Sequence, residues 1–321
     1  SRNIVKKNFS WESKFTWSYV KNKVVKLPDN GLPQNRVDGI RVGNTNEYFG
    51  GIAEGEPLYQ VVAFKMKHII RTPEQLAAAI YDSYSKGYNP DDGTTVKGRK
   101  NMGDYEWVNR PGTTKAVVNG EEVEQINSED KFVIGYSVPH STGGFSNTFR
   151  YKGLSLNVYL DWAIGHTIRH AQMARQFINT FTGNTALNAG VLDTWSPQNP
   201  DAKYARFFPN DSDWGNRNWR QSNFMVEKAD YLCLRDVSLY YDLPEHWLRK
   251  VGIRKVTVGV TGNTLCYWTG VTGAISPESG IGSNAGAGMY TPVSTSNSNS
   301  DITANMMPVP RKIIFSLKLV F

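Results

Sequence analysis

Between residues 8 and 19, large apolar and small polar side chains alternate with a period of two. The aromatic positions are Phe9, Trp11, Phe15, Trp17 and Tyr19, interrupted only by Ser13. Because successive side chains of a strand point to opposite faces, this spacing predicts a β-strand. Five aromatic residues on one face exceed what a soluble sandwich core normally needs, but they suit a strand that meets a lipid interface. A strand of a soluble protein is the alternative interpretation of this segment.

The composition narrows the class of protein further. Aromatic residues make up 12% of the 321 residues and charged residues only 20%, which does not indicate a disordered chain. No run of about 18 apolar residues occurs, which excludes a helical membrane span. A transmembrane β-barrel stays open, because its signal is alternation. The net charge of +7 comes from scattered Lys and Arg, so we expect no nucleic-acid partner.

Six further segments carry the same alternation, which gives about seven expected strands. They are residues 59–70, 144–151, 154–164, 228–242, 254–267 and 311–321. Lys152-Gly153 predicts a tight hairpin turn between two of them. Within 228–242 the apolar parity slips, which predicts a β-bulge near Arg235-Asp236.

The connections between these segments are unequal in length. Residues 71–143, 166–224 and 269–310 form long loops, whereas LPEHWLRKVG before residue 254 can make only one helical turn. Long loops on one side and short turns on the other are expected of an outer-membrane barrel. Within the first long loop, Thr72 as an N-cap and Gly87 as a stop predict a surface helix over 72–87.

The sequence predicts neither a catalytic site nor a cofactor or metal site. His166 and His170 are four residues apart, but no nearby carboxylate completes a ligand set. Cys233 and Cys266 belong to no metal-binding or disulfide pattern. The adjacent carboxylates at positions 129 and 130 are expected in a turn rather than as catalytic acids. We therefore expect a protein that is not an enzyme.

A stretch rich in tryptophan within the second long loop is the best candidate for ligand binding. Its members are Trp195, Trp214, Asn216, Arg217, Trp219 and Arg220. Aromatic side chains stack on sugar faces or apolar ligand groups, while Asn and Arg bind hydroxyls or carboxylates. In the alternative interpretation, these tryptophans pack the long loop onto itself.

The chain ends on an amphipathic strand whose apolar face carries Phe315, Leu317, Leu319 and the terminal Phe321. Such a strand resembles the terminal signal by which the bacterial assembly machinery recognises outer-membrane barrels. The polar residues on the other faces of the strands are expected to line a lumen. They include Glu12, Lys14, Asn157, Tyr159, Asp161 and Lys318.

Several segments, taken in order, resemble a known family. They are NFSWESKFTWSYVKNKVVKL, EGEPLYQVVAFK, SEDKFVIGYSVP, GGFSNTFRYKGLSLNV, ADYLCLRDVSLYYDLPEHWLRKVGI, KVTVGVTGNTLCYWTG and RKIIFSLKLVF. They look like the C-terminal portion of SusC/RagA-type TonB-dependent outer-membrane transporters of Bacteroidetes. Cys233 and Cys266 depart from the basic, polar or aromatic residues that are more usual at those positions.

The resemblance implies an all-β fold, a transmembrane antiparallel barrel of roughly 22 strands with a plugged lumen and long extracellular loops. About seven strands cannot close around a plug, and an open edge in lipid would leave backbone groups unpaired. Residues 1–321 are therefore expected to be the C-terminal part of the barrel, without the plug domain. Ser1 begins the chain and residues 1–20 show no secretory signal, so either processing removed one or the chain is part of a longer polypeptide.

The function implied by the resemblance is TonB-dependent import of oligomeric nutrients across a Gram-negative outer membrane. Glycans are the expected ligands, with peptides as the alternative. The implied partners are a SusD-like surface lipoprotein, the remaining barrel and plug, the TonB complex through the missing N-terminal part, and outer-membrane lipid. A soluble or surface-exposed β-rich glycan-binding module is the competing interpretation, and a passive porin is a third.

Overall fold

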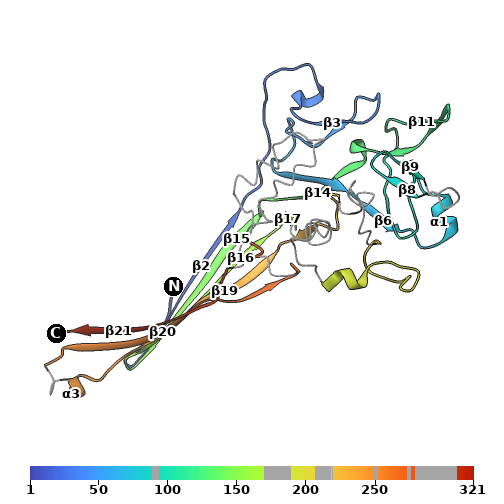
Figure 1. The fold of residues 1–321 in the computed structure, drawn as a ribbon. Helices are drawn as coiled ribbons and strands as arrows, with labels where there is room; N and C mark the ends of the chain where they lie inside the picture. Colours follow the sequence, from blue (N-terminus) through green and yellow to red (C-terminus); the bar gives the residue numbers. More distant parts are fainter. Residues whose placement is uncertain are drawn as a thin grey trace.

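The computed structural model describes residues 1–88, 94–169, 189–206, 218, 220–248, 252–272, 276–278 and 309–321. Figure 1 shows a long sheet that runs from one end of the molecule into a more compact part at the other end. We call this compact part, built mainly from residues 22–88, 94–136, 189–206, 218 and 220–228, the loop body. Among the described residues, no helix has the length and apolar character needed to cross a membrane.

The long sheet has seven strands in the order β1-β2-β15-β16-β19-β20-β21, with every neighbouring pair antiparallel. Its strands are β1 (Arg2–Lys6), β2 (Phe9–Tyr19), β15 (Ser141–Tyr151), β16 (Leu154–Ile164), β19 (Tyr231–Asp242), β20 (Lys255–Thr269) and β21 (Lys312–Val320). The expectation of seven strands and an all-β fold is confirmed, with β1 and β21 at the two edges.

The membership of the sheet differs from the prediction at one segment. Residues 59–70 form two short strands of the loop body, β5 (Gln60–Phe64) and β6 (Met66–Ile69), and β1 supplies the seventh strand instead. β5 pairs with β14 (Lys131–Tyr136), and the consecutive residues Ala63 and Phe64 are both buried. Alternation marks a strand in any small sheet, so the pattern could not tell which sheet this segment joins.

Two local features of the sheet agree with the sequence. Lys152 and Gly153 adopt positive φ angles of 44° and 86°, which gives the tight turn between β15 and β16. Arg235 is skipped in the pairing of β19 with both of its neighbours, so the predicted bulge is confirmed. The connection after β19 contains α3 (Glu245–Leu248), the single helical turn expected there.

Strand register divides the sheet into an apolar face and a polar face. Aromatic side chains stack across the apolar face, with ring centroids 5.8 Å apart for Trp11 and Phe149 and 5.5 Å apart for Phe15 and Trp162. Phe15 is 63% exposed and Trp17 64%, so nothing in the described chain covers this face. The predicted lumen residues Glu12, Lys14, Asn157, Tyr159, Asp161 and Lys318 share the opposite, polar face.

The loop body is built from short elements around an aromatic core of Phe64, Ile69, Tyr105, Trp107, Ile126 and Ala205. Its other short strands and single turns of helix follow in chain order. They are η1 (Pro33–Asn35), β3 (Ile40–Arg41), β4 (Tyr48–Phe49), α1 (Pro73–Ala77), β7 (Tyr81–Asp82), β8 (Lys86–Tyr88), β9 (Thr95–Lys97), β10 (Tyr105–Trp107), β11 (Ala116–Val118), β12 (Glu121–Val123), β13 (Gln125–Ile126), η2 (Ser128–Asp130), β17 (Thr167–Arg169), η4 (Ala189–Asp193) and β18 (Val226–Lys228).

The predicted surface helix is much shorter than expected. Thr72 caps α1 as predicted, because its side chain accepts a hydrogen bond from the Gln75 backbone, but α1 ends at Ala77. The following residues form β7, which pairs in parallel with β13. Strand pairing with a segment more than 40 positions away ends the helix, and local sequence does not encode such a partner.

Candidate functional site

Three ion pairs hold the loop body together. Lys100 Nζ lies 2.8 Å from Glu106 Oε1, Arg206 Nε lies 2.6 Å from Asp104 Oδ1, and Arg220 Nη2 lies 2.6 Å from Asp82 Oδ2. The carboxylate of each pair is buried, and the paired cation offsets the large cost of removing that charge from water. Two of the pairs join residues more than 100 positions apart and fix the second long loop onto the first.

Arg220, one of the predicted ligand residues, lies inside the loop body. Its guanidinium carbon is 4.7 Å from the ring centroid of Trp107 and 5.1 Å from that of Phe64. Its side chain is only 6% exposed, with the Asp82 carboxylate beside it. Here Arg220 neutralises a buried acid and packs on aromatic faces, which is a stabilising arrangement.

Trp195 packs against the same aromatic core, and its backbone N–H donates to the carbonyl of Tyr204 at 2.9 Å. The structure therefore brings Trp195 and Arg220 to one core. This agrees with the alternative interpretation, in which the long loop packs onto itself. The other four predicted ligand residues, Trp214, Asn216, Arg217 and Trp219, lie outside the described residues. Their role in ligand binding stays a prediction.

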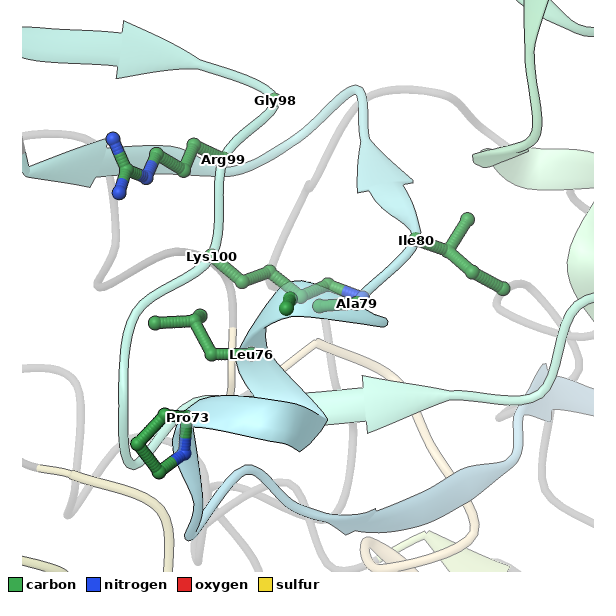
Figure 2. Close-up of a pocket in the computed structure, with 8 residues that line it drawn as sticks. Pro73, Leu76, Ala79, Ile80, Gly98, Arg99 and Lys100 are labelled. Atoms are coloured by element: carbon green, nitrogen blue, oxygen red, sulfur yellow. The ribbon is translucent and has the colours of Figure 1, made fainter.

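A hollow of about 390 Å³ opens beside α1, at a place that the sequence did not indicate (Figure 2). Pro73, Leu76 and Ile80 give it an apolar lining, and Lys100 crosses its edge. Figure 2 shows the Lys100 side chain running toward Ala79, while Arg99 points away from the helix. Since the Lys100 ammonium group pairs with Glu106, the hollow presents mainly apolar surface.

A second cluster lies on the polar face of the sheet. Arg235 at the bulge of β19 forms an ion pair with Asp161 of β16, and a second one with Glu278, which follows β20. Tyr267 Oη lies 3.3 Å from Arg235 Nη1. The sequence placed Asp161 on this face but did not indicate its partner, although the slip in apolar parity marked the position of Arg235.

The two titratable groups of interest outside the sheet are Asp130 and His166. Burial raises the pKa of Asp130 to about 6, although the backbone N–H groups of Arg110 and Asn127 donate to its carboxylate. Burial also lowers the pKa of His166, whose Nε2 lies 3.1 Å from the Pro277 carbonyl oxygen. His170 lies outside the described residues, among which no cluster of three metal-ligating side chains occurs.

The terminal strand β21 leaves one edge of the sheet and its apolar face open. Phe315 is 82% exposed and the terminal Phe321 75%, and Leu317 and Leu319 are exposed as well. β21 pairs only with β20 in the described chain, so its outer backbone edge can accept another strand. The predicted assembly residues are accessible, and their role in assembly stays a prediction.

Three curated relatives share sequence with most of the chain. TonB-dependent receptor P3 of Formosa agariphila is 27% identical over 283 residues, which are 87% of this chain and 24% of the receptor. TonB-dependent receptor P26 of the same organism is 26% identical and covers 99% of this chain and 28% of the receptor. The resemblance to TonB-dependent receptors is confirmed. The chain spans about a quarter of the length of the curated relatives it matches.

Solved structures with a similar fold include those of RagAB. The chain matches a structure of the RagAB peptide importer in the open-open state over 100% of its own length and 27% of that chain. The TM-score is 0.59 at 16% identity, and a second RagAB structure gives 0.54 at 18% identity. The chain therefore shares its fold with part of the RagAB structures. No family model matches the chain.

Proposed function

We propose that this chain is part of a TonB-dependent importer in the outer membrane of a Gram-negative bacterium. The two-faced sheet carries the proposal. Its apolar face exposes a continuous band of aromatic and aliphatic side chains, and its polar face carries charged and hydroxyl groups. A band of this kind is stable against lipid, whereas it would cause a soluble protein to aggregate. Transport rather than catalysis is the activity proposed.

The chain supplies wall strands and loops, and the rest of the transporter supplies what the sheet lacks. Within the described residues, β1 and β21 have no partner strand on their outer edges, and unpaired backbone groups in lipid cost several kcal/mol each. We assign residues 1–321 to the C-terminal part of the barrel, with the plug and the TonB-contacting segment outside them. In this proposal, the exposed edges of β1 and β21 pair with the remaining strands of the barrel.

The ligands proposed are oligomeric nutrients, with glycans as the first class to test and peptides as the second. The names of the curated relatives mention no ligand, whereas the RagAB structures are described as those of a peptide importer. Within the tryptophan-rich stretch, the proposed ligand contacts are Trp214, Asn216, Arg217 and Trp219, whereas Trp195 and Arg220 pack in the core of the loop body. A SusD-like surface lipoprotein is the proposed partner that captures the ligand.

Fractionation of the native source tests this function, followed by detergent extraction and mass spectrometry of the proteins that co-purify. We expect the chain in the outer membrane, with a plug-bearing part and a SusD-like lipoprotein. Uptake of labelled oligosaccharides and oligopeptides, with and without TonB, then separates the two ligand classes. TonB-independent uptake would indicate a passive porin, and recovery as a soluble lone chain would overturn the proposal in favour of a soluble binding module.

A further inference from the structure

Arg235 is held in a fixed orientation on the polar face of the sheet. Its Nε and Nη2 atoms each donate to one carboxylate oxygen of Asp161, both at 2.8 Å. This two-point contact fixes the plane of the guanidinium group. Arg235 follows the parity of Tyr231 and Cys233 on the polar face, and the β-bulge after it places the next residue, Asp236, on the same face.

The same guanidinium group also contacts a second carboxylate. Arg235 Nη2 also donates to Glu278, and Nη1 donates to Tyr267 Oη. Glu278 does not belong to the sheet, because residues 276–278 follow β20 and fold back over its polar face. Two contacts place this segment there. They are the Pro277 carbonyl against His166 Nε2 and the Glu278 carboxylate against Arg235.

The two carboxylates have different roles. Asp161 lies in a regular strand and orients Arg235, with Tyr231 Oη also 3.4 Å from its Oδ2 atom. Glu278 comes from a connecting segment, and its side chain is 27% exposed. Replacing Glu278 by another carboxylate would leave the charge of the cluster unchanged. Such an exchange therefore brings no additional buried charge onto the polar face.

We propose that Arg235 is a carboxylate-binding position on the polar face, and that Glu278 occupies it in place of a carboxylate group of the ligand. This inference rests on the proposed function in one respect, because import would bring a ligand past the polar face. Uronic acid residues of a glycan and the C-terminus of a peptide both present the required group. The segment 276–278 is released when such a group takes the place of Glu278.

The test measures binding to the complete, detergent-purified transporter by calorimetry. The probes are trigalacturonate with its methyl ester, and trialanine with its amide, because each pair differs only in the carboxylates. In the Glu278→Gln variant, we expect the acidic member of one pair to bind about tenfold more tightly than in the unchanged protein. The neutral member should be unaffected, and the pair that responds identifies the source of the carboxylate.

Two matched variants control the binding measurement. Glu121→Gln makes the same change at an exposed carboxylate of the loop body and should alter nothing. Arg235→Lys keeps the charge but loses the two-point geometry, so in combination with Glu278→Gln it should abolish the gain. Equal behaviour of acidic and neutral probes in the Glu278→Gln variant would overturn the proposal.

Cys233 gives a second readout that needs no ligand. It is fully buried and pairs with Asp161, whereas Cys266 pairs with Leu234 on the apolar face and can be replaced by serine. In that background, Glu278→Gln should increase labelling of Cys233 by a cationic methanethiosulfonate about tenfold, because the covering segment is released. Unchanged labelling would show that Glu278 holds no cover in place. Both readouts are independent of uptake, so failed import with intact binding would count only against the proposed function.

Discussion

Burial decides what an arginine does in this chain. Arg220 and Arg71 both pair with an aspartate, but Asp82 beside Arg220 is fully buried and Asp201 beside Arg71 is 97% exposed. A buried carboxylate that loses its cation pays its full desolvation cost, whereas an exposed one is stabilised by water. Residue type alone therefore did not distinguish a ligand-binding arginine from a stabilising one.

We expect Arg220→Gln to destabilise the loop body by about 3–5 kcal/mol, because it leaves Asp82 buried without its partner. Hydrogen exchange of peptides covering β6 and β10 in the purified transporter would measure this change. Arg71→Gln is the matched control and should cost about 1 kcal/mol or less. Similar exchange rates in the two variants would contradict the role assigned to the Asp82 pair.

Asp130 should make the stability of the loop body depend on pH. Its folded-state pKa of about 6 lies above the ordinary value of 3.8, so the folded state holds the proton more tightly. The stabilisation is complete below about pH 4 and is lost as the pH rises through 6. Asp130→Asn should flatten the pH dependence of the protection factors of β14 between pH 4 and 7, after correction for intrinsic exchange, whereas Glu121→Gln should preserve their slope. An unchanged slope in Asp130→Asn would exclude this group as the source.

At the scale of elements, the strands of the sheet satisfy their own polar groups on the apolar face. Trp11 Nε1 donates to Asn147 Oδ1 at 3.0 Å, and Trp17 Nε1 donates to Ser141 Oγ at 2.9 Å. Both bonds join β2 to β15 across one strand pair. An indole N–H or an amide facing an apolar surrounding would otherwise remain unpaired at a cost of a few kcal/mol.

The terminal strand should be needed for assembly into the membrane. We expect Phe321→Ala to lower the amount of heat-modifiable protein in the outer membrane several-fold, because the end of β21 is exposed and available for recognition. Val25→Ala, at an exposed apolar residue between elements, serves as the control. Heat-modifiable protein at the unchanged level in Phe321→Ala would count against this role.

At the scale of the whole molecule, the sheet has one apolar side and one polar side. Val158 of β16 pairs with Asn147 and Val237 on the apolar face, while its neighbour Asn157 pairs with Thr148 and Ser238 on the polar face. These two positions are adjacent in sequence and lie at nearly the same depth. They therefore form a matched pair for testing which side meets lipid.

We expect Val158→Arg to destabilise the assembled transporter by about 2–4 kcal/mol, since a charge facing lipid near the middle of a membrane is costly. Asn157→Arg places the same charge on the polar face and should cost less than about 1 kcal/mol. Denaturant unfolding of the transporter in lipid vesicles measures both values. Equal costs at the two positions would contradict the assignment of the apolar face to lipid.

The sheet could be predicted largely from the sequence, because apolar and polar residues alternate along a strand that has one apolar and one polar face. The bounds of β2 and β16 follow the alternation of residues 9–19 and 154–164, and the bulge at Arg235 follows the slip in parity. The pattern failed at residues 59–70, where β5 and β6 join other partners, and at α1, which ends where β7 begins. Strand partners distant in the chain caused both differences.

By itself, the sequence determined the strands, their two faces and the terminal aromatic residue, because each depends on spacing within one segment. Only the tertiary structure decided which charged residues meet, because Arg220 reaches Asp82 across 138 positions and Arg235 reaches Asp161 across 74. Ion pairs of that separation depend on how long loops fold back, and no local pattern records it. The same folding decided that Trp195 and Arg220 pack in the core of the loop body and that Glu278 lies against the polar face.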